Sequence, residues 1–562
     1  MAKKVFYDDD ARRRVLEGSR ILYNAVKTTM GPKGRNVVIS KSYGSPTVTH
    51  DGVTVAKGVD IADVDDETLG YKVGAELIKQ AANKMNDVAG DGTTTVTVLT
   101  YHILKEANPL ITAGHNPMLL RKGLESASKE VIAKLSTMSE DIKASKKRVA
   151  EVATISAGDS VIGELIADVI DKVGKDGVVT VEEGQGLELE SEVVEGFTMD
   201  KGFVSPYMVT DTTRMEAIID KPSILITDKK ISSVQEILPI LEKLAQTGKK
   251  DIVIIADDLE GEALGTLVLN KLKGVLNIVA IKAPAFGDRR KDVLQDIAIL
   301  TGGAVISEEQ GYTFETADIS MLGSARKVIV TKDESTIIEG SGAKKEVEKR
   351  VKQINEQAKL ATSKYEKENL EQRRAALSGK VAVIKVGGAS ETEIEEKKFR
   401  VDDAVAAVKA ALDEGIVPGG GKTLINLSLY LANKHSPVKG IEMAKIFAEQ
   451  GVITGNPGMD ILIKALNRPF ITLMNNAGYS PAGYIQDITK KDGLGVDVNT
   501  GKIVDLKTTG VIDPTRVTKE AIQNAVSIAG TAMTMGALVV EVPEKTPPMP
   551  DMSGMGGGMM GM

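Results

Sequence analysis

Cysteine and tryptophan are both absent from this chain of 562 residues, and aromatic residues make up only 3% of it. Without cysteine the chain cannot form disulfides, offer a thiolate nucleophile or bind a metal through sulfur. The scarcity of aromatic side chains argues against the stacking surfaces that bind single-stranded nucleic acid. Four scattered histidines, with no ligand-like spacing, do not predict a zinc site: His50, His102, His115 and His435.

Long apolar runs are also missing. No stretch of about 18 apolar residues occurs, so we expect no transmembrane helix, and the first residues lack the apolar centre of a signal peptide. A net charge of −7 does not match the basic surface of a nucleic-acid-binding protein. We therefore expect a cytoplasmic protein without nucleic-acid or membrane partners. Its length predicts several domains, because a single core stops growing well below this size.

The stretch from Ala89 to Thr95 is the most informative part of the sequence. Apolar residues at helical spacing on both sides predict that Gly90-Asp91-Gly92 is a turn leading into a helix that begins with three threonines. Glycine lets the backbone approach a ligand, a helix N-terminus attracts phosphate, and a carboxylate suits Mg²⁺. A plain helix-turn-helix with a threonine cap explains the same residues, and this pattern alone supports the two interpretations about equally.

Three further segments allow a structural or a functional interpretation. Gly31-Pro32 ends a helix predicted over 11–29, either as a simple cap or as a second edge of a ligand pocket. Asp51, after a hairpin predicted over 36–49, fits a turn aspartate or a second acidic ligand. Gly415 to Thr423 resembles a P-loop, but Lys422-Thr423 comes one position too late, so we do not predict a Walker-type site.

These motifs together resemble the group I chaperonins, the Hsp60/GroEL family. The resemblance covers essentially the whole chain, with the motifs in the same order. Its segments are 31–38, 51–53, 90–95, 154–157, 283–290, 415–421 and 513–515. It implies a multi-domain fold with helical and α/β parts. The alternation of strand-like and helix-like pieces over 195–381 independently predicts an α/β layer there.

By this resemblance the chain path is discontinuous. The implied division is a mainly helical equatorial ATP-binding domain (1–137 and 414–543), a small α/β intermediate domain (138–194 and 382–413), an α/β apical domain (195–381) and a disordered Gly/Met-rich tail (544–562). The tail is too poor in large apolar residues other than methionine to form a core.

The resemblance also implies the site residues. Asp403 and Asp51 would be catalytic, with Asp403 orienting the attacking water, and Asp91 would bind the metal. The implied nucleotide-binding residues are Thr29, Met30, Gly31, Pro32, His50, Asp91, Gly92, Thr93, Thr94, Thr95, Gly420, Asp497, Val498, Asn499 and Asp513. The implied cofactors are ATP and Mg²⁺, with K⁺ as an optional further ion. The alternative interpretation of Asp403 is structural, because an acidic residue near a helix start often only complements the helix dipole.

Two predicted helices, 233–245 and 262–272, carry more aliphatic residues than one core face needs. We expect Ile237, Leu244 and Leu267 to be buried. By resemblance, the following residues would line an exposed surface for substrate and co-chaperonin: Phe203, Tyr207, Met208, Leu238, Leu241, Leu264, Val268 and Leu269. Aliphatic side chains suit this use because their attraction is non-directional, about 1.5–3 kcal/mol per buried side chain.

The implied function is ATP-driven binding, encapsulation and refolding of non-native polypeptides, with a small GroES/Hsp10-like lid and about 14 subunits in two stacked rings. Some residues depart from the family pattern. His50 replaces a lysine that contacts the nucleotide, Lys380 replaces a hinge glycine, and 58–70 is longer than usual. A metabolic ATP-dependent enzyme and a ring-forming scaffold with weak ATPase activity remain as alternatives.

Overall fold

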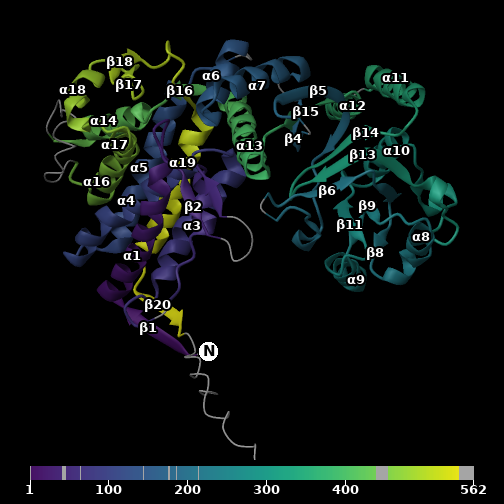
Figure 1. Ribbon diagram of the computed structural model, residues 1–562, viewed down its shortest axis with the longest axis horizontal. Helices are drawn as coiled ribbons and strands as arrows, with labels where there is room; N and C mark the ends of the chain where they lie inside the picture. Colours follow the sequence, from purple (N-terminus) through teal and green to yellow (C-terminus); the bar gives the residue numbers. More distant parts are fainter. Residues whose placement is uncertain are drawn as a thin grey trace, which may run out of the picture. The chain divides into compact units, whose positions relative to one another are not determined.

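A computed structural model describes residues 2–40, 46–63, 65–142, 145–174, 177–184, 186–212, 214–361, 363–437 and 454–542. The chain divides into two compact units, the first formed by 1–168 with 388–562 and the second by 169–387 (Figure 1). The predicted tail, 544–562, lies outside the described residues. The division into three domains remains a prediction.

The first unit is mainly helical. Its N-terminal part contains β1 (Lys3–Tyr7), α1 (Asp8–Val26), η1 (Lys27–Thr29), β2 (Val37–Ile39), β3 (Thr47–Thr49), α2 (Gly52–Gly58), α3 (Tyr71–Ala89), α4 (Thr93–Thr112), α5 (Pro117–Met138), α6 (Lys146–Ala157) and α7 (Ser160–Val173), which runs into the second unit. Its C-terminal part contains α13 (Glu391–Glu414), β16 (Ile416–Pro418), α14 (Lys422–His435), α16 (Pro457–Leu466), α17 (Arg468–Asn476), η5 (Pro481–Gly483), α18 (Ile485–Ile488), β17 (Leu494–Asp497), β18 (Lys502–Asp505), β19 (Ile512–Pro514), α19 (Thr515–Ala532) and β20 (Ala537–Glu541).

Segments from the two ends of the chain build one core in this unit. Helix α19 packs against α3, α4 and α5, and α16 packs against α4 and α5. Helix α4 is apolar on most of its surface, so that Val96, Leu99 and Ile103 are all at most 1% exposed. A helix that is apolar on most sides belongs in a protein interior. The turn before α4 is therefore attached to a rigid element.

Four two-stranded sheets complete the first unit: β1–β20, β2–β3, β16–β19 and β17–β18. The predicted hairpin near residues 36–49 is confirmed as β2 and β3. The sequence of 422–536 predicts helices, with turn-like residues at 497–499 and 513–514, and this prediction is wrong at β17, β18 and β19. Strands of three or four residues are too short to show the alternation of apolar and polar residues that reveals a strand. Asp513 therefore lies in a strand and not in a turn.

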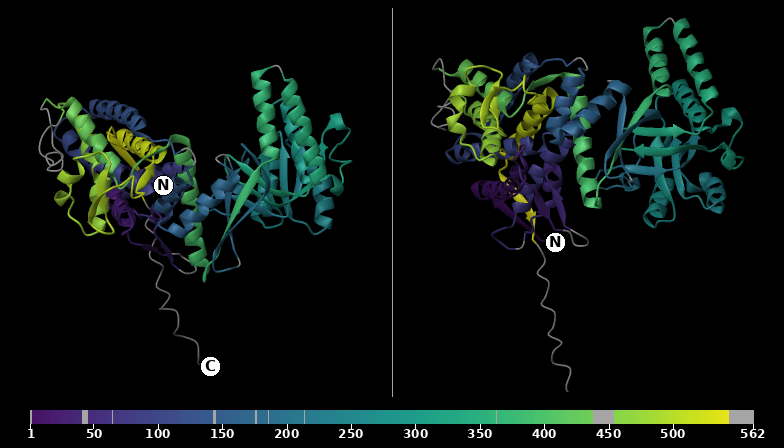
Figure 2. Two further views of the ribbon diagram at one scale, coloured as in Figure 1. Left: turned by 90° about the horizontal axis from the view of Figure 1, so that it is seen from above. Right: turned by 45° about the horizontal axis from the view of Figure 1, so that its top comes forward.

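The second unit is an α/β layer, as predicted. It contains β4 (Val178–Glu183), β5 (Leu189–Met199), η2 (Pro206–Met208), β6 (Ala217–Asp220), β7 (Ser223–Thr227), β8 (Lys230–Ile231), α8 (Val234–Gln246), β9 (Asp251–Ala256), β10 (Asp258–Leu259), α9 (Gly261–Leu272), β11 (Asn277–Lys282), α10 (Asp288–Thr301), β12 (Val305–Ile306), η3 (Glu308–Gln310), η4 (Ile319–Met321), β13 (Gly323–Val330), β14 (Ser335–Gly340), α11 (Lys344–Leu360), α12 (Lys364–Leu377) and β15 (Lys380–Val386). Helices α11 and α12 run side by side as a hairpin (Figure 2).

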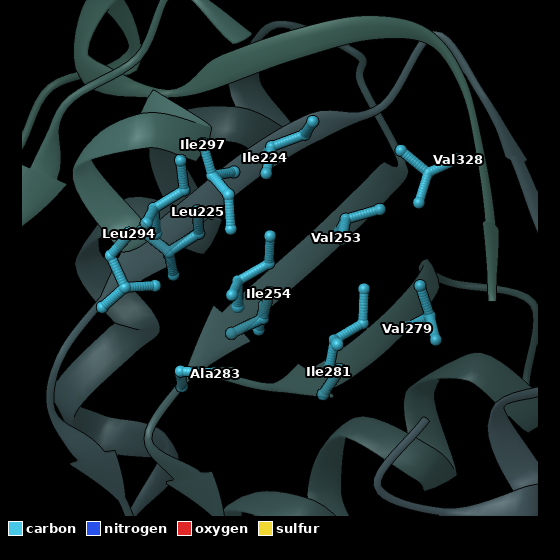
Figure 3. Close-up of a cluster of buried hydrophobic side chains, with 14 of the residues drawn as sticks. Ile224, Leu225, Val253, Ile254, Val279, Ile281, Ala283, Leu294, Ile297 and Val328 are labelled. Atoms are coloured by element: carbon cyan, nitrogen blue, oxygen red, sulfur yellow. The ribbon is translucent and has the colours of Figure 1, made fainter. Parts of the chain in front are cut away.

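One sheet of ten strands organises this unit, in the order β11-β9-β7-β13-β14-β5-β15-β4, with β12 and β6 paired to β7 and β13. Strands β7, β9 and β11 are parallel and alternate with α8 and α9 along the chain, as βαβ units require. Their aliphatic side chains form a cluster with Leu294 and Ile297 of α10 (Figure 3). Continuous Ile/Val runs such as 252–255 are buried on both faces, which explains why these strands were visible in the sequence.

Strand β5 belongs to two pairings in succession. Its residues up to Glu195 pair with β15, and those from Gly196 onward pair with β14. Gly196 donates its N–H to the carbonyl of Gly379 (3.1 Å), and a Cβ on Gly196 would lie 2.2 Å from a methyl group of Val381. The chain crosses itself closely at this point, which requires glycine at position 196.

Among the residues that the structure describes, no helix combines the length and apolar character needed to cross a bilayer.

Candidate functional site

The predicted turn between two helices is present in the first unit. Helix α3 ends at Ala89, Gly90 and Gly92 both have positive φ (67° and 81°), and α4 begins at Thr93. Such backbone angles strain any residue with a Cβ, so glycine is needed on both sides of Asp91. The first N–H groups of α4 have no partner within the helix and can bind an anion.

A second helix begins against the same point. A Cβ on Gly52, the first residue of α2, would lie 2.4 Å from Thr94 Oγ1 and 2.8 Å from Thr93 Oγ1. Asp51 caps this helix, because its two carboxylate oxygens accept the N–H groups of Val53 (3.1 Å) and Thr54 (2.8 Å). The starts of α2 and α4 therefore lie close to each other. The Asp51 carboxylate occupies the positive end of α2, whereas the positive end of α4 remains free to attract an anion.

The loop after α1 forms a third side of this site. Thr29 Oγ1 lies 3.1 Å from Thr94 Oγ1. Gly31, with φ of 84°, lies against Leu473, since a Cβ there would be 2.1 Å from a Leu473 methyl carbon. The predicted residues 29–31, 51 and 91–95, which are far apart in the sequence, are thus brought together.

Gly420 and Asp513 lie beside the same loop. A Cβ on Gly420 would lie 3.9 Å from another methyl carbon of Leu473, so the two predicted segments share this contact. Gly419 lies directly against Asp513, whose Oδ1 would be 2.8 Å from an added Cβ. The glycine-rich segment follows β16, which pairs antiparallel with β19, and precedes α14. This geometry differs from the parallel βα unit of a Walker loop. It agrees with the prediction from the sequence that this segment is not a Walker-type site.

The acids of the site repel one another. Burial, together with the nearby Asp91 carboxylate, raises the pKa of Asp513 to about 7. Burial also raises the pKa of Asp91, and the charge of Asp51 contributes in the same direction. Partly buried carboxylates with raised pKa values indicate a site whose negative charge is not balanced by the protein itself.

A divalent cation would balance that charge, and the donor set fits Mg²⁺ only in part. In the described part of the chain no group of three or more acidic or histidine side chains is arranged to hold a metal. Mg²⁺ commonly uses one or two carboxylates, with waters and substrate phosphates as its other ligands. Asp91, between the two helix N-termini, suits that mode and would hold the ion once a nucleotide supplies its phosphates.

Asp403 lies on the first unit's long helix α13, which passes the same turn. A Cβ on Gly90 would lie 2.1 Å from the Cβ of Ala406, so α13 and the turn are in close contact. Ala406 and Asp403 are three residues apart and so share a helix face. The structure therefore places the predicted catalytic acid within about one helical turn of the Asp91 loop.

His50 lies at the junction of these elements. The Cβ of a side chain on Gly34 would be 2.7 Å from an imidazole carbon of His50. Burial lowers the pKa of His50 below its usual value of 6.5, a direction that Arg400 favours and that Glu396 and Asp51 oppose. His50 is therefore mostly neutral at pH 7, so it does not replace the positive charge of the lysine found in the resembling family.

Asp497, Val498 and Asn499, which by the resemblance would line the base and ribose end of the nucleotide, lie at the end of β17 and in the turn towards β18. The carboxylate of Asp497 accepts the Asn499 N–H (3.0 Å) and the Thr500 hydroxyl (2.7 Å), while the Val498 side chain is buried. Tyr479 connects this turn to the loop after Gly31. Sequence reasoning missed Tyr479 because an isolated tyrosine outside any motif carries no signal.

Residues 22–543 match the model of the TCP-1/cpn60 chaperonin family. The chain belongs to this family. A similar solved structure is the chaperonin gp146 from the bacteriophage EL 2 (Pseudomonas aeruginosa), crystallised in the presence of ATP-BeFx. It has a TM-score of 0.64 at 22% identity and covers 96% of this chain and 99% of that chain. The predicted chaperonin subunit fold is thus confirmed.

In the second unit of this chaperonin, helices α8 and α9 lie in contact, and α9 also contacts η2. Leu269 and Tyr207 are exposed (50% and 68%), and four more predicted residues are half-buried: Phe203, Leu238, Leu264 and Val268. Leu272 and Val275, which were not predicted, are also exposed (66% and 52%). Together, Phe203, Tyr207, Leu238, Leu264, Val268, Leu269, Leu272 and Val275 form what we call the α8–α9 surface.

Two predicted members of this surface are buried instead, which is a correction. Met208 is 0% exposed, and its sulfur accepts the N–H of Ala280 in β11 (3.3 Å). Leu241 is 7% exposed and belongs to the core of the second unit. Leu241 follows Ile237 by four residues and therefore lies on the same core-facing side of α8. The expected burial of Ile237, Leu244 and Leu267 is confirmed.

Proposed function

We propose that this chaperonin is an ATP-hydrolysing member of group I that binds non-native polypeptides and encloses them under a small lid protein. The observation that carries the proposal is the convergence of the α2 and α4 N-termini on Asp91, with Thr29, Thr93 and Thr94 beside it. The free N-terminus of α4, the threonine hydroxyls and the Asp91 carboxylate provide what a Mg²⁺-bound triphosphate needs.

In the proposed mechanism the protein supplies positioning and charge stabilisation, which are its main tasks in phosphoryl transfer. The free N–H groups at the start of α4 would bind the phosphates, and Asp91 would hold Mg²⁺. Asp403 orients the attacking water from α13. Movement of α13 relative to the Asp91 turn would then control hydrolysis, since Asp403 acts only when it reaches the nucleotide.

The α8–α9 surface is the proposed binding site for substrate and lid. Its exposed aliphatic residues Leu269 and Leu272 lie on α9, with Val275 just after it, and the half-buried Leu238 lies on the neighbouring helix α8. An apolar surface of this kind binds chains of many sequences because its attraction needs no particular hydrogen-bond pattern.

Subunit association is supported by the β1–β20 and β2–β3 sheets. Each has only two strands and carries exposed valines, among them Val38 (66%) and Val539 (55%). Two-stranded sheets are marginal alone and gain stability from further strands. We propose that they contribute to contacts between subunits in stacked rings.

ATP turnover by an Asp403→Ala variant tests the catalytic assignment. We expect it to bind ATP but to hydrolyse it at least about tenfold more slowly, because the attacking water loses its acceptor. Asp413→Ala is a matched control on the same helix, where the side chain is 51% exposed and pairs with Arg516. Equal ATP turnover by wild type and Asp403→Ala would contradict the assignment and favour the weak-ATPase scaffold, the alternative that the neutral His50 supports.

Suppression of aggregation tests the substrate surface. Leu269→Ser should weaken the protection that the protein gives to a chemically denatured test protein, since it removes an exposed apolar contact. Leu360→Ser is the matched control, because Leu360 is 81% exposed but lies at the end of α11. Equal loss in both variants would mean that the α8–α9 surface has no special role.

A further inference from the structure

Tyr479 lies just beyond α17 and contacts two of the predicted nucleotide-binding segments. The ammonium of Lys33 is 5.0 Å from the centre of the Tyr479 ring. A Cβ on Gly501 would lie 2.9 Å from the Tyr479 hydroxyl oxygen, so the same side chain also reaches the turn that follows Asp497. One aromatic residue therefore joins the loop containing Gly31 to the turn containing Asp497.

The ring itself is held in place by its surroundings. The N–H of Tyr479 donates to the carbonyl of Met474 (2.9 Å), which fixes the backbone at the end of α17. Tyr484 meets the ring edge-on, with 5.9 Å between the ring centres. Aromatic pairs favour this geometry, so the orientation of Tyr479 is set before any ligand binds.

Two neighbours of Tyr479 contact the same loop. The Asn476 amide donates to the carbonyls of Lys27 (2.8 Å) and Met30 (3.0 Å). Leu473 lies between Gly31 and Gly420, as described above. The segment from Leu473 to Tyr479 thus touches three parts of the site that are distant in the sequence: the Gly31 loop, Gly420 and the turn after Asp497.

We propose that Tyr479 is a positioning residue of the nucleotide site, which fixes the distance between the end that binds the triphosphate and the end that binds the base. This inference rests on the proposed ATP-binding function. A cation and the face of an aromatic ring attract each other electrostatically. The contact between Lys33 and Tyr479 therefore holds the Gly31 loop against the Tyr479 ring. Without this contact the loop and the turn would have to be ordered by the nucleotide, at a cost in affinity.

A double-mutant cycle on the full-length protein tests this role. Tyr479→Leu and Lys33→Met should each raise the Kd for ATP and the KM roughly three- to tenfold, while kcat changes by less than about twofold. Because each variant already breaks the shared contact, the double variant should be no weaker than the weaker single variant. Tyr479→Phe keeps the ring, whose Cε1 and Cζ atoms would also lie 3.1 Å from a Cβ on Gly501, and should remain near wild type.

Tyr430 provides a matched control. It lies on α14 with Lys434 at 5.5 Å from its ring centre, so Tyr430→Leu and Lys434→Met break the same kind of contact elsewhere. Both should leave the Kd for ATP unchanged. Circular dichroism checks folding. If Tyr479→Leu does not fold, the Kd for ATP is measured instead for Lys33→Met and for the double variant Lys33→Met/Tyr479→Phe. Both of these proteins retain the buried core.

The outcomes separate the two proposals. A wild-type protein that binds no ATP would refute the proposed function and this inference with it. ATP binding by the wild type, together with an unchanged Kd in Tyr479→Leu or strictly additive effects in the double variant, would overturn only the role of Tyr479. A large fall in kcat without a change in Kd would also overturn it, because positioning of the bound nucleotide acts on affinity first.

Discussion

The carboxyl group of Asp513 shows how the proposed site reduces the stability of the folded protein without nucleotide. Its pKa, raised by burial to about 7, lies well above the value of 3.8 expected in the unfolded chain. Between these two values the folded protein binds a proton that the unfolded chain releases. This group therefore lowers stability progressively as the pH rises from about 4 to about 7.

Asp513→Asn should consequently raise the melting temperature of the nucleotide-free protein more at pH 8 than at pH 5, because it removes a penalty that grows with pH. The same change should weaken ATP binding if Asp513 contacts the nucleotide. Scanning calorimetry at the two pH values and an ATP titration measure both effects. An equal gain in melting temperature at pH 5 and pH 8 would contradict the assigned pKa.

Lys422 carries a second buried charge, at the start of α14. The residue is 1% exposed, and burial lowers the pKa of its amine from 10.5 to about 8, while Asp492 partly opposes the change. The unfolded chain holds this proton more tightly than the folded protein does. Lys422 therefore lowers the stability of the folded protein by its full amount below pH 8, and this destabilisation disappears as the pH rises towards 10.5.

Lys422→Met should therefore stabilise the protein at pH 7, by about 3 kcal/mol according to the free energy that corresponds to this change in pKa. The gain should shrink at pH 9 and above. Lys434→Met, on the same helix but 50% exposed, should give no such gain. Thermal unfolding followed by circular dichroism compares the two variants. A stability difference that does not depend on pH would show that packing, and not charge, is responsible.

At the scale of elements, one buried carboxylate holds three helices of the second unit together. Asp296 of α10 is 1% exposed, and its oxygens accept from Arg350 of α11 and Arg373 of α12, each at 2.7 Å. Both arginines also pair with the more exposed Asp292. Removing one partner of a buried ion pair leaves the other charges uncompensated, which is strongly destabilising.

Asp296→Asn should lower the stability of the second unit by about 3–5 kcal/mol, since two arginines would lose their buried counter-charge. Asp292→Asn is the matched control, because Asp292 contacts the same arginines but is 56% exposed. It should cost less than about 1 kcal/mol. Hydrogen exchange in α10, α11 and α12 measures local stability, and similar exchange rates in both variants would refute this role for Asp296.

Two helix starts illustrate how far the sequence could predict elements. Ser363 and Glu366 have the spacing of a capping box, which predicts that a helix starts there. Helix α12 does begin at this point, but Ser363 makes no side-chain cap bond. Ser233 and Glu236 form a complete capping box at α8, which went unnoticed among the aliphatic residues that follow. Spacing therefore predicts where a helix begins more reliably than it predicts hydrogen bonds, since tertiary contacts decide the orientation of the side chains.

The phosphate end of the candidate site was visible in the sequence because glycine, aspartate and threonine stand together in one motif around Asp91. The contacts of Leu473, Asn476 and Tyr479 were not visible. They come from a segment more than 400 residues after the Gly31 loop, and no local pattern specifies such a distant contact. Burial of Leu241 was missed because a helix with excess aliphatic residues does not reveal which of them face outward.

At the scale of the whole molecule, the proposed assembly of subunits can be tested on the surface that the small sheets expose. Val38→Lys should reduce ring formation, because a charge would replace an apolar side chain on the β2–β3 sheet. Val161→Lys is a suitable control, since Val161 on α7 is almost equally exposed (64% against 66%). Light scattering after size-exclusion chromatography measures the subunit number. Loss of assembly in both variants alike would argue against a specific role for β2–β3.

Strand β5 has a mechanical consequence. It is hydrogen-bonded to β15 before residue 196 and to β14 from that residue onward. A twisting force applied to β14 is transmitted to β15 through strand β5, and β5 bends most easily at Gly196. A side chain added at position 196 would collide with Val381 of β15, so it should push the two strands apart and weaken the transmission of torque from β14 to β15.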